Sequence, residues 1–316
     1  MHTDQVPDRR KVDTSAMDLA CLPLLDLKMD LGEGLLWDAE RGRLLMTDIV
    51  NGRLLDIDID EGVSEFWQFD EPLAWVLKTT CRGVYLLGLR SGIACFDIEQ
   101  PSRLRWINRD FPGNPSCRLN DACADPQGKI WYGSMNSVNP SAEDGQLASF
   151  SIKDGLHLHD SQFTVTNGPV VSADGQHLYL NDTLQGTVYR YRISPNGADL
   201  SNREVFVQFD SSQGHPDGMC FDTSGHLWIA LWGMGKLVRI DPNGHLINRV
   251  AVPAKNVTNV CFCGPDRDRL IVSSAAIDMS DADHQRYPHA GSLFEVLNHG
   301  CVGLLTHWVN VDSLWV

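Results

Sequence analysis

The sequence has no apolar run that approaches the ~20 residues needed to cross a bilayer as a helix, and it is short of positive charge. Its 26 Lys and Arg side chains stand against 41 Asp and Glu, which gives a formal net charge of −15. Phosphate backbones and anionic membrane surfaces attract proteins through Lys and Arg. The composition therefore argues against nucleic acid and membranes as partners, and is compatible with cations and neutral small molecules.

The sequence also lacks the marks of a secreted, disulfide-stapled protein. Its nine cysteines are odd in number and scattered, and the closest pair, Cys261 and Cys263, has one intervening residue, which is not the spacing of a zinc knuckle. Residues 1–17 are polar and charged, without the apolar core of a signal peptide. We predict a disordered leader over 1–17, a single domain over 18–316, reduced thiols and a cytoplasmic location.

Three familiar signatures are missing. No stretch shows the periodicity of an amphipathic helix over three turns. No Gly-x-Ser-x-Gly segment is present, which argues against a serine esterase. The histidines do not follow the His-Glu-x-x-His spacing of a zinc hydrolase. We therefore expect an all-β chain whose chemistry depends on other side chains.

One phrase recurs six times: a turn rich in Asp, Gly and Pro, then a short apolar strand. These strands begin at Leu44, Val84, Ile130, Leu178, Leu227 and Leu270. The starts lie 40 to 49 residues apart, and four-stranded propeller blades repeat every ~40–50 residues. Strands with period-two alternation, such as 187–191 and 236–240, follow the copies. The repeats predict a six-bladed β-propeller, and we expect 304–311 to supply the last strand, closing the ring with 22–27.

Repeats identify equivalent positions at the start of each innermost strand, where a propeller brings them to its axis. In chain order these positions are Glu33, Ala74, Asn120, Asn167, Asp217 and Thr258. Five of the six carry a side-chain oxygen and none is Lys or Arg. Such oxygen donors suit Ca²⁺, Mg²⁺ or Mn²⁺. Ordered water is the alternative occupant, but two neighbouring carboxylates favour a cation.

Further short segments share a likeness, in order along nearly the whole chain beyond the leader. They are Leu31-Gly32-Glu33-Gly34 with Trp37-Asp38, Arg118-Leu119-Asn120-Asp121, Asp125-Pro126-Gln127-Gly128, Gly133-Ser134-Met135, Thr166-Asn167-Gly168, Pro216-Asp217-Gly218-Met219, Leu227-Trp228-Ile229-Ala230 and Gly264-Pro265-Asp266. Together they resemble the family of the senescence marker protein (regucalcin), gluconolactonase and related sugar lactonases.

The resemblance implies a propeller with one divalent metal ion (Ca²⁺, Zn²⁺, Mg²⁺ or Mn²⁺) held by Glu33, Asn167 and Asp217. It implies that Asn120 borders the ion and that Arg118 contacts the substrate. The family's usual reaction is hydrolysis of an aldonolactone, of the gluconolactone, arabinonolactone, xylonolactone or galactonolactone type, to the open sugar acid. As a hypothesis we assign Asp217 as general base, since a carboxylate beside a water-bearing metal can take its proton.

The departures from the family pattern concern the substrate. After Met135 the chain reads Asn-Ser-Val-Asn over 136–139, where some relatives carry an acidic residue that helps select substrate. Trp75 and Trp232 are expected near enough to the axial loops to wall a pocket. The polar loop 276–289 is either a lid or an exposed connection.

Two other functions compete with the lactonase. A metal-dependent phosphotriesterase could use the same electrophile, because one scaffold hosts several chemistries. A non-catalytic calcium-binding or protein-contact propeller is the second alternative, although a protein-contact propeller would not need the axial carboxylates. The sequence makes no prediction of oligomeric state.

Overall fold

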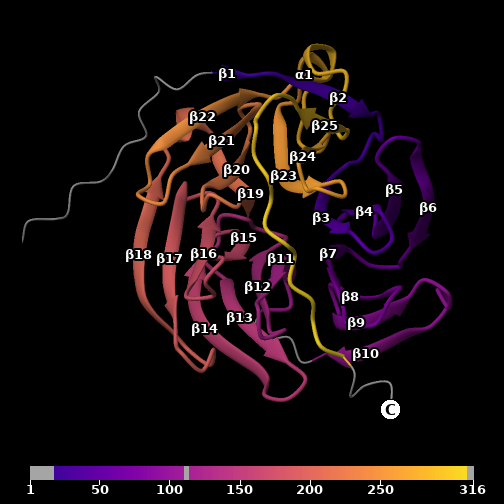
Figure 1. Cartoon of the computed structure of the whole chain (residues 1–316), viewed down its shortest axis with the longest axis vertical. Helices are drawn as coiled ribbons and strands as arrows, with labels where there is room; N and C mark the ends of the chain where they lie inside the picture. Colours follow the sequence, from indigo (N-terminus) through magenta and orange to yellow (C-terminus); the bar gives the residue numbers. More distant parts are fainter. Residues whose placement is uncertain (1–17, 110–113, 312–316) are drawn as a thin grey trace, which may run out of the picture.

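A computed structural model describes residues 18–109 and 114–311; the predicted leader lies outside them. The strands form six sheets around a common axis, which confirms the six-bladed propeller (Figure 1).

The strands of each blade follow one another along the chain. Blade 1 contains β3 (Gly32–Asp38), β4 (Arg43–Asp48), β5 (Arg53–Asp58) and β6 (Gly62–Gln68). Blade 2 contains β7 (Leu73–Lys78), β8 (Val84–Leu89), β9 (Gly92–Asp97) and β10 (Leu104–Asn108), and blade 3 contains β11 (Cys117–Ala124), β12 (Ile130–Asn136), β13 (Gly145–Ser151) and β14 (Gly155–Phe163). Blades 4 and 5 contain β15 (Thr166–Val171), β16 (His177–Asp182), β17 (Thr187–Ile193) and β18 (Leu200–Gln208); and β19 (His215–Phe221), β20 (Leu227–Trp232), β21 (Lys236–Ile240) and β22 (Leu246–Ala251). Blade 6 contains β23 (Asn256–Cys263), β24 (Arg269–Ala275) and β25 (Leu293–Val296).

The ring is closed by the N-terminal side of the chain. Strand β2 (Cys21–Leu25) pairs antiparallel with β25 and completes blade 6, while β1 (Asp18–Leu19) pairs with β22 of blade 5. The prediction that 304–311 supplies the closing strand is therefore wrong, because β2 already fills that edge. The segment instead crosses one face of the propeller, making an isolated bridge between Val309 and Thr79 (Figure 1).

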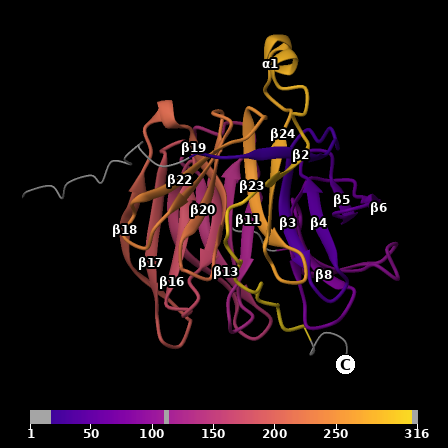
Figure 2. The same cartoon turned by 45° about the horizontal axis from the view of Figure 1, so that its top comes forward.

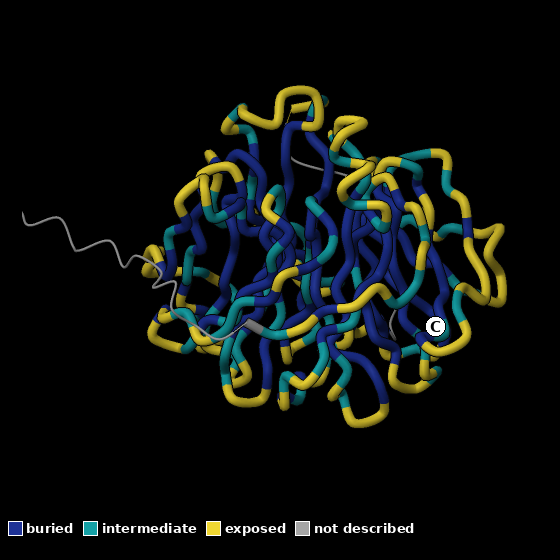
Figure 3. Tube along the Cα trace, turned by 90° about the horizontal axis from the view of Figure 1, so that it is seen from above, coloured by how far each residue is buried: buried dark blue, intermediate teal, exposed yellow. Residues whose placement is uncertain are grey.

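Large apolar side chains hold neighbouring blades together. Trp75, Trp131 and Trp228 are fully buried. The ring of Trp228 in blade 5 meets that of Phe262 in blade 6 edge to face, with centroids 6.4 Å apart, a favourable aromatic geometry. Figure 3 shows the buried strands forming the body of the molecule, with exposed residues confined mostly to loops. This rigid packing fixes the innermost strands that carry the axial residues.

Each of the six innermost strands has an irregular register near its axial residue. In β3 the shift lies between Glu33 and Leu36, and in β15 between Asn167 and Val170. An irregularity of this kind re-aims side chains that regular pairing would alternate between faces. Gly34 (φ 57°) and Gly168 (φ 52°) lie at these points in the left-handed region that favours glycine.

The loop 276–289 contains one short helix, α1 (Asp281–Arg286), which the sequence did not predict because six residues are too few to show a helical period. A capping box starts it: the Asp283 amide donates to Ser280 Oγ, and Ser280 N donates to Asp283 Oδ2. Lys255 Nζ lies 2.7 Å from Asp283 Oδ2. The helix projects from the end of the propeller opposite the described C-terminal residues (Figure 2). Within the described residues, no helix has the length and apolar character to cross a membrane.

Candidate active site

A cavity of about 320 Å³ opens on the axis. Its lining includes five side chains that the sequence predicted to act together: Glu33, Arg118, Asn120, Asn167 and Asp217. They come from β3, β11, β15 and β19, one innermost strand in each of four blades. The two other ring positions do not line this cavity. Ala74 has no polar side chain, and the hydroxyl of Thr258 donates to the carbonyl oxygen of Gly32.

Three of these side chains form one hydrogen-bonded chain. Arg118 Nη1 donates to Asn120 Oδ1 at 2.6 Å, and Asn120 Nδ2 donates to Asn167 Oδ1 at 2.6 Å. Asn167 Nδ2 donates in turn to Thr183 Oγ1 at 2.9 Å. These hydrogen bonds fix the side-chain amide orientations of Asn120 and Asn167. The Oδ1 atom of Asn167 therefore keeps a second lone pair for a metal ion or another ligand.

Glu33 is buried at the floor of the cavity. Its Oε2 accepts from the Gly34 amide at 3.0 Å and from Asn259 Nδ2 at 2.7 Å. Burial raises the pKa of Glu33, although these two donors act against the rise. Sequence reasoning missed Asn259 because it considered one residue per blade and chose Thr258. Asn259 is the next residue of β23, at the position that Asp121 occupies in β11.

Asp217 is the second buried carboxyl group of the floor. Burial, together with the negative charges of Glu33 and Asp121, raises its pKa well above the usual range. Its Oδ1 is buried and has no hydrogen-bond partner among the described residues. A buried oxygen in that condition is costly unless a proton or a cation satisfies it.

A third carboxyl group, Asp121, lies beneath the floor. It accepts from the amides of Ala122 (2.7 Å) and Gly168 (2.8 Å), while burial and the charge of Glu33 raise its pKa to about 8. The sequence analysis gave it no role, although it directly follows Asn120.

The charges of these groups do not balance. Of the three carboxyl groups, Glu33 and Asp217 interact with the guanidinium of Arg118, whose pKa is lowered by burial to about 10, and Asp121 lies beneath them. With all three carboxyl groups ionised, the negative charges would exceed the positive charge by two, and one divalent cation would offset this excess and satisfy Asp217 Oδ1. No three His, Cys, Asp or Glu side chains within 18–109 and 114–311 are grouped as a metal site. The amide oxygen of Asn167 lines the same cavity and is an oxygen donor of the type that would complete a set with Glu33 and Asp217.

Above this polar floor the cavity wall is mostly apolar. Ile49, Val50, Leu184, Trp232 and Ile277 line it, each at a loop or strand end on this side of the propeller. Trp232 thus walls the candidate active site. The loop 276–289 contributes its first part, through Ile277 and the neighbouring Asp278, to the wall.

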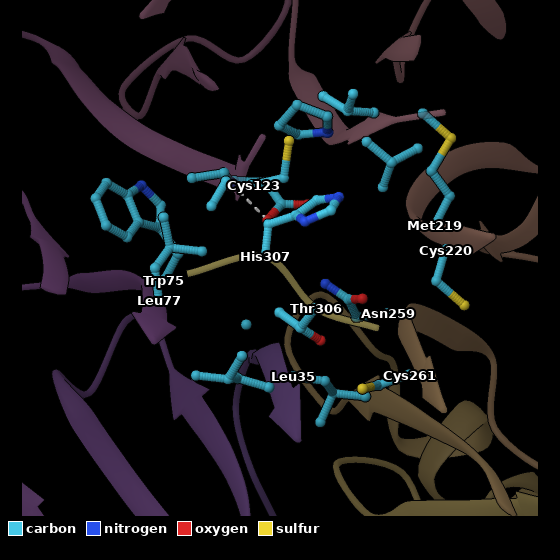
Figure 4. A pocket seen from close by; sticks show the side chains of 18 of the residues that line it. Leu35, Trp75, Leu77, Cys123, Met219, Cys220, Asn259, Cys261, Thr306 and His307 are labelled. Carbon is cyan, nitrogen blue, oxygen red and sulfur yellow. Dashed lines mark hydrogen bonds between the residues drawn. The ribbon is translucent and has the colours of Figure 1, made fainter. Parts of the chain in front are cut away.

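A second, smaller cavity of about 160 Å³ lies on the other side of the floor (Figure 4). It is lined by Trp75, by the thiols of three blades (Cys123, Cys220 and Cys261), and by the segment 304–307. Burial raises the pKa of Cys123 and Cys220, whereas a hydrogen bond from Cys263 lowers that of Cys261. Asp121 and Asn259 also line this cavity, so they belong to the partition between the two spaces.

Fold and site together define a class: six-bladed propellers with an axial cavity that has a polar floor of carboxyl and amide side chains. The chain belongs to the SMP-30/gluconolactonase/LRE-like family, because the family model matches residues 31–276. It is 32% identical over 270 residues to a putative sugar lactone lactonase, YvrE, of Bacillus subtilis, covering 85% of this chain and 91% of the relative. It is 31% identical over 281 residues to the pentonolactonase XacC of Haloferax volcanii (86% and 92% covered).

Solved structures agree with this assignment. A calcium-binding protein, regucalcin, from Agrobacterium tumefaciens superposes with a TM-score of 0.87 at 25% identity, over 94% of this chain and 100% of that one. A luciferin-regenerating enzyme superposes with a TM-score of 0.85 at 25% identity, over 92% of this chain and 99% of that one. The resemblance seen in the sequence is therefore confirmed at the level of the family and the fold.

Proposed function

We propose that this protein is a metal-dependent sugar lactonase that hydrolyses an aldonolactone to the aldonic acid. The observation that carries the proposal is the convergence of Glu33, Asn167 and Asp217 on one cavity, with Asp217 Oδ1 buried and unpartnered. The names of relatives support it: a putative sugar lactone lactonase, a pentonolactonase and a 6-deoxy-6-sulfogluconolactonase from Pseudomonas putida.

Glu33, Asn167 and Asp217 would hold one divalent ion, Ca²⁺, Zn²⁺, Mg²⁺ or Mn²⁺. When bound, such an ion supplies a Lewis acid that polarises the lactone carbonyl and acidifies water. Three protein ligands leave open positions on the ion, as a catalytic site requires. The ion would also offset the excess negative charge at the floor.

The protein's own groups then have separate roles. Asp217 takes a proton from the attacking water through its carboxylate, which sits at the floor with one oxygen otherwise unsatisfied. Arg118 offers a planar fork of donors to substrate oxygens or to the carboxylate that forms. Asn120 holds Arg118 on one side and Asn167 on the other. It thereby couples the orientation of Arg118, the substrate-binding side chain, to that of Asn167, the metal-binding side chain.

Acid release from gluconolactone, arabinonolactone, xylonolactone and galactonolactone tests the proposal, measured with and without a chelator and after each metal is added back. We expect chelation to abolish turnover of at least one lactone and one of the four ions to restore it. Asp217→Asn is expected to reduce kcat by about 10²-fold or more, in line with general-base catalysis. Absence of chelator-sensitive turnover on every lactone would reject the lactonase.

Two alternatives are separated by the same preparation. A phosphotriesterase would hydrolyse an organophosphate ester faster than any lactone. A calcium-binding protein without catalysis would bind Ca²⁺ tightly and turn over neither substrate. The similarity to a structure described as a calcium-binding protein, regucalcin, is the reason to test this alternative.

All nine cysteines are unpaired, which favours a reducing compartment such as the cytoplasm.

A further inference from the structure

The mouth of the axial cavity is built from apolar residues in five blades. Its wall includes Val50, Pro140, Leu184, Trp232 and Ile277. All five lie where the second strand of a blade leaves the sheet: between β4 and β5, β12 and β13, β16 and β17, at the end of β20, and between β24 and β25. The same structural position, the end of the second strand, thus contributes apolar surface to the cavity mouth in five of the six blades. We refer to these five residues as the apolar rim.

This rim is in contact with water. Val50 is 41% exposed and Leu184 is 39% exposed. Two further apolar side chains in the corresponding loops of blades 3 and 5 are also exposed, Val138 by 76% and Met234 by 39%. Exposed apolar residues that line a concave site, as Val50 and Leu184 do, are typical of ligand-binding grooves.

Few polar side chains line the cavity beside the apolar rim, and two of them already form hydrogen bonds within the protein. Ser137 Oγ donates to the carbonyl oxygen of Ser116 at 2.8 Å, and Thr183 Oγ1 already accepts from Asn167 at 2.9 Å. Asp278 is the charged side chain of the upper wall. A substrate hydroxyl held against Val50 or Leu184 would lose water without gaining a comparable partner.

The orientation of a bound lactone follows from the floor. Its ester group must reach Asp217 and Arg118, and the floor separates this cavity from the one below. The remainder of the substrate therefore points to the mouth. Its terminal carbon meets the apolar rim.

Building on the lactonase proposed above, we propose that the apolar rim selects lactones whose terminal carbon is a methyl or longer alkyl group rather than a hydroxymethyl group. Among aldonolactones these are the deoxy sugar lactones. An apolar pocket disfavours an analogue that adds one hydroxyl by up to about 10²-fold. The rim therefore acts as a specificity determinant separate from the polar floor.

Matched substrates test this directly with the full-length, metal-loaded protein. The pairs are L-fuconolactone against L-galactonolactone, L-rhamnonolactone against L-mannonolactone, and γ-valerolactone against γ-hydroxymethyl-γ-butyrolactone. Members of a pair differ by one terminal hydroxyl. We expect kcat/KM for the methyl member to exceed that of its partner by on the order of tenfold. A preference for the hydroxylated member, or hydrolysis of other aldonolactones with none of these six, overturns the inference while the lactonase proposal stands.

Variants locate the preference. Leu184→Asn and Val50→Thr make the rim polar, and each is expected to lower the methyl-to-hydroxymethyl ratio several-fold. Leu158→Asn and Val63→Thr are matched controls, because these residues are exposed (51% and 43%) on the outer strands β14 and β6. The controls should keep the wild-type ratio. An unchanged ratio in both rim variants, or an equal change in the controls, rejects the role of the rim. If the wild-type protein shows no chelator-sensitive turnover of any lactone, the lactonase proposal itself is rejected.

Discussion

Asn120 Nδ2 donates to Asn167 Oδ1 at 2.6 Å, linking a substrate-side residue of blade 3 to a candidate metal ligand of blade 4. Because Asn120 Oδ1 simultaneously accepts from Arg118, its amide can adopt only one of two orientations. The oxygen of Asn167 is positioned by a neighbour rather than by its own strand.

Asn120→Ala should therefore weaken metal binding. Loss of a partner that orients a ligand commonly costs 10–100-fold in metal affinity or activity. Calorimetric titration of the variant with the active metal measures the change. Asn136→Ala is a suitable control, since Asn136 is similarly buried and donates to Asp144 at 2.7 Å, away from the floor residues. Equal metal affinity in Asn120→Ala and wild type would show that Asn167 needs no such support.

The metal-free protein should lose stability as pH rises. The pKa of Asp121 rises on folding from 3.8 to about 8, because burial and the charge of Glu33 disfavour its ionised form. The folded state therefore binds this proton more tightly; its contribution is complete below pH 3.8 and disappears as pH rises through about 8. Tm of chelated protein is expected to fall between pH 5 and 8, and metal should raise Tm more at pH 8. A pH slope identical in Asp121→Asn and wild type would contradict this origin.

The buried Lys78–Asp38 pair should matter more than an exposed one. Lys78 Nζ lies 2.7 Å from Asp38 Oδ1, with side-chain exposures of 3% and 0%. Lys78→Met would leave a buried carboxylate without its cation, a loss of about 3–5 kcal/mol in unfolding free energy. Lys255→Met, which breaks the more exposed pair with Asp283, should cost about 1 kcal/mol or less. Denaturant titration of both variants is the measurement, and similar losses would refute the expected ranking.

Gly168→Ala tests the close approach at the floor. Gly168 has φ 52°, and an added Cβ would lie 2.8 Å from the carbonyl oxygen of Asp217. Gly155 has φ 74° but open space around it, so Gly155→Ala isolates the backbone cost of about 1–2 kcal/mol. We expect Gly168→Ala to exceed this loss in unfolding free energy and also to weaken metal binding by displacing Asp217. If the two variants lose the same stability and both bind metal normally, the floor tolerates the methyl group.

Several features were accessible from the sequence because propeller blades repeat. The period of 40 to 49 residues identified six blades, and equivalent positions singled out Glu33, Asn120, Asn167 and Asp217 before any coordinates. Asn259 escaped this reasoning because only one position per blade was compared, and Asn259 follows that position in β23 while donating to Glu33. Residues 304–311 were misassigned because an apolar segment can close a ring or cross a face, and only the pairing of β2 with β25 decides between them.

The sequence by itself determined the architecture and the chemical type of the axial side chains, since both follow from local patterns that each blade repeats. Only the tertiary structure decided which side chains share a hydrogen bond, which oxygen of Asp217 is left unsatisfied, and that Asp121 and Asn259 form the partition beneath the floor. It also brought five apolar residues, from four loops and the end of β20, to one mouth. Those relations join residues that are far apart in the chain, and no local pattern records the distance between them.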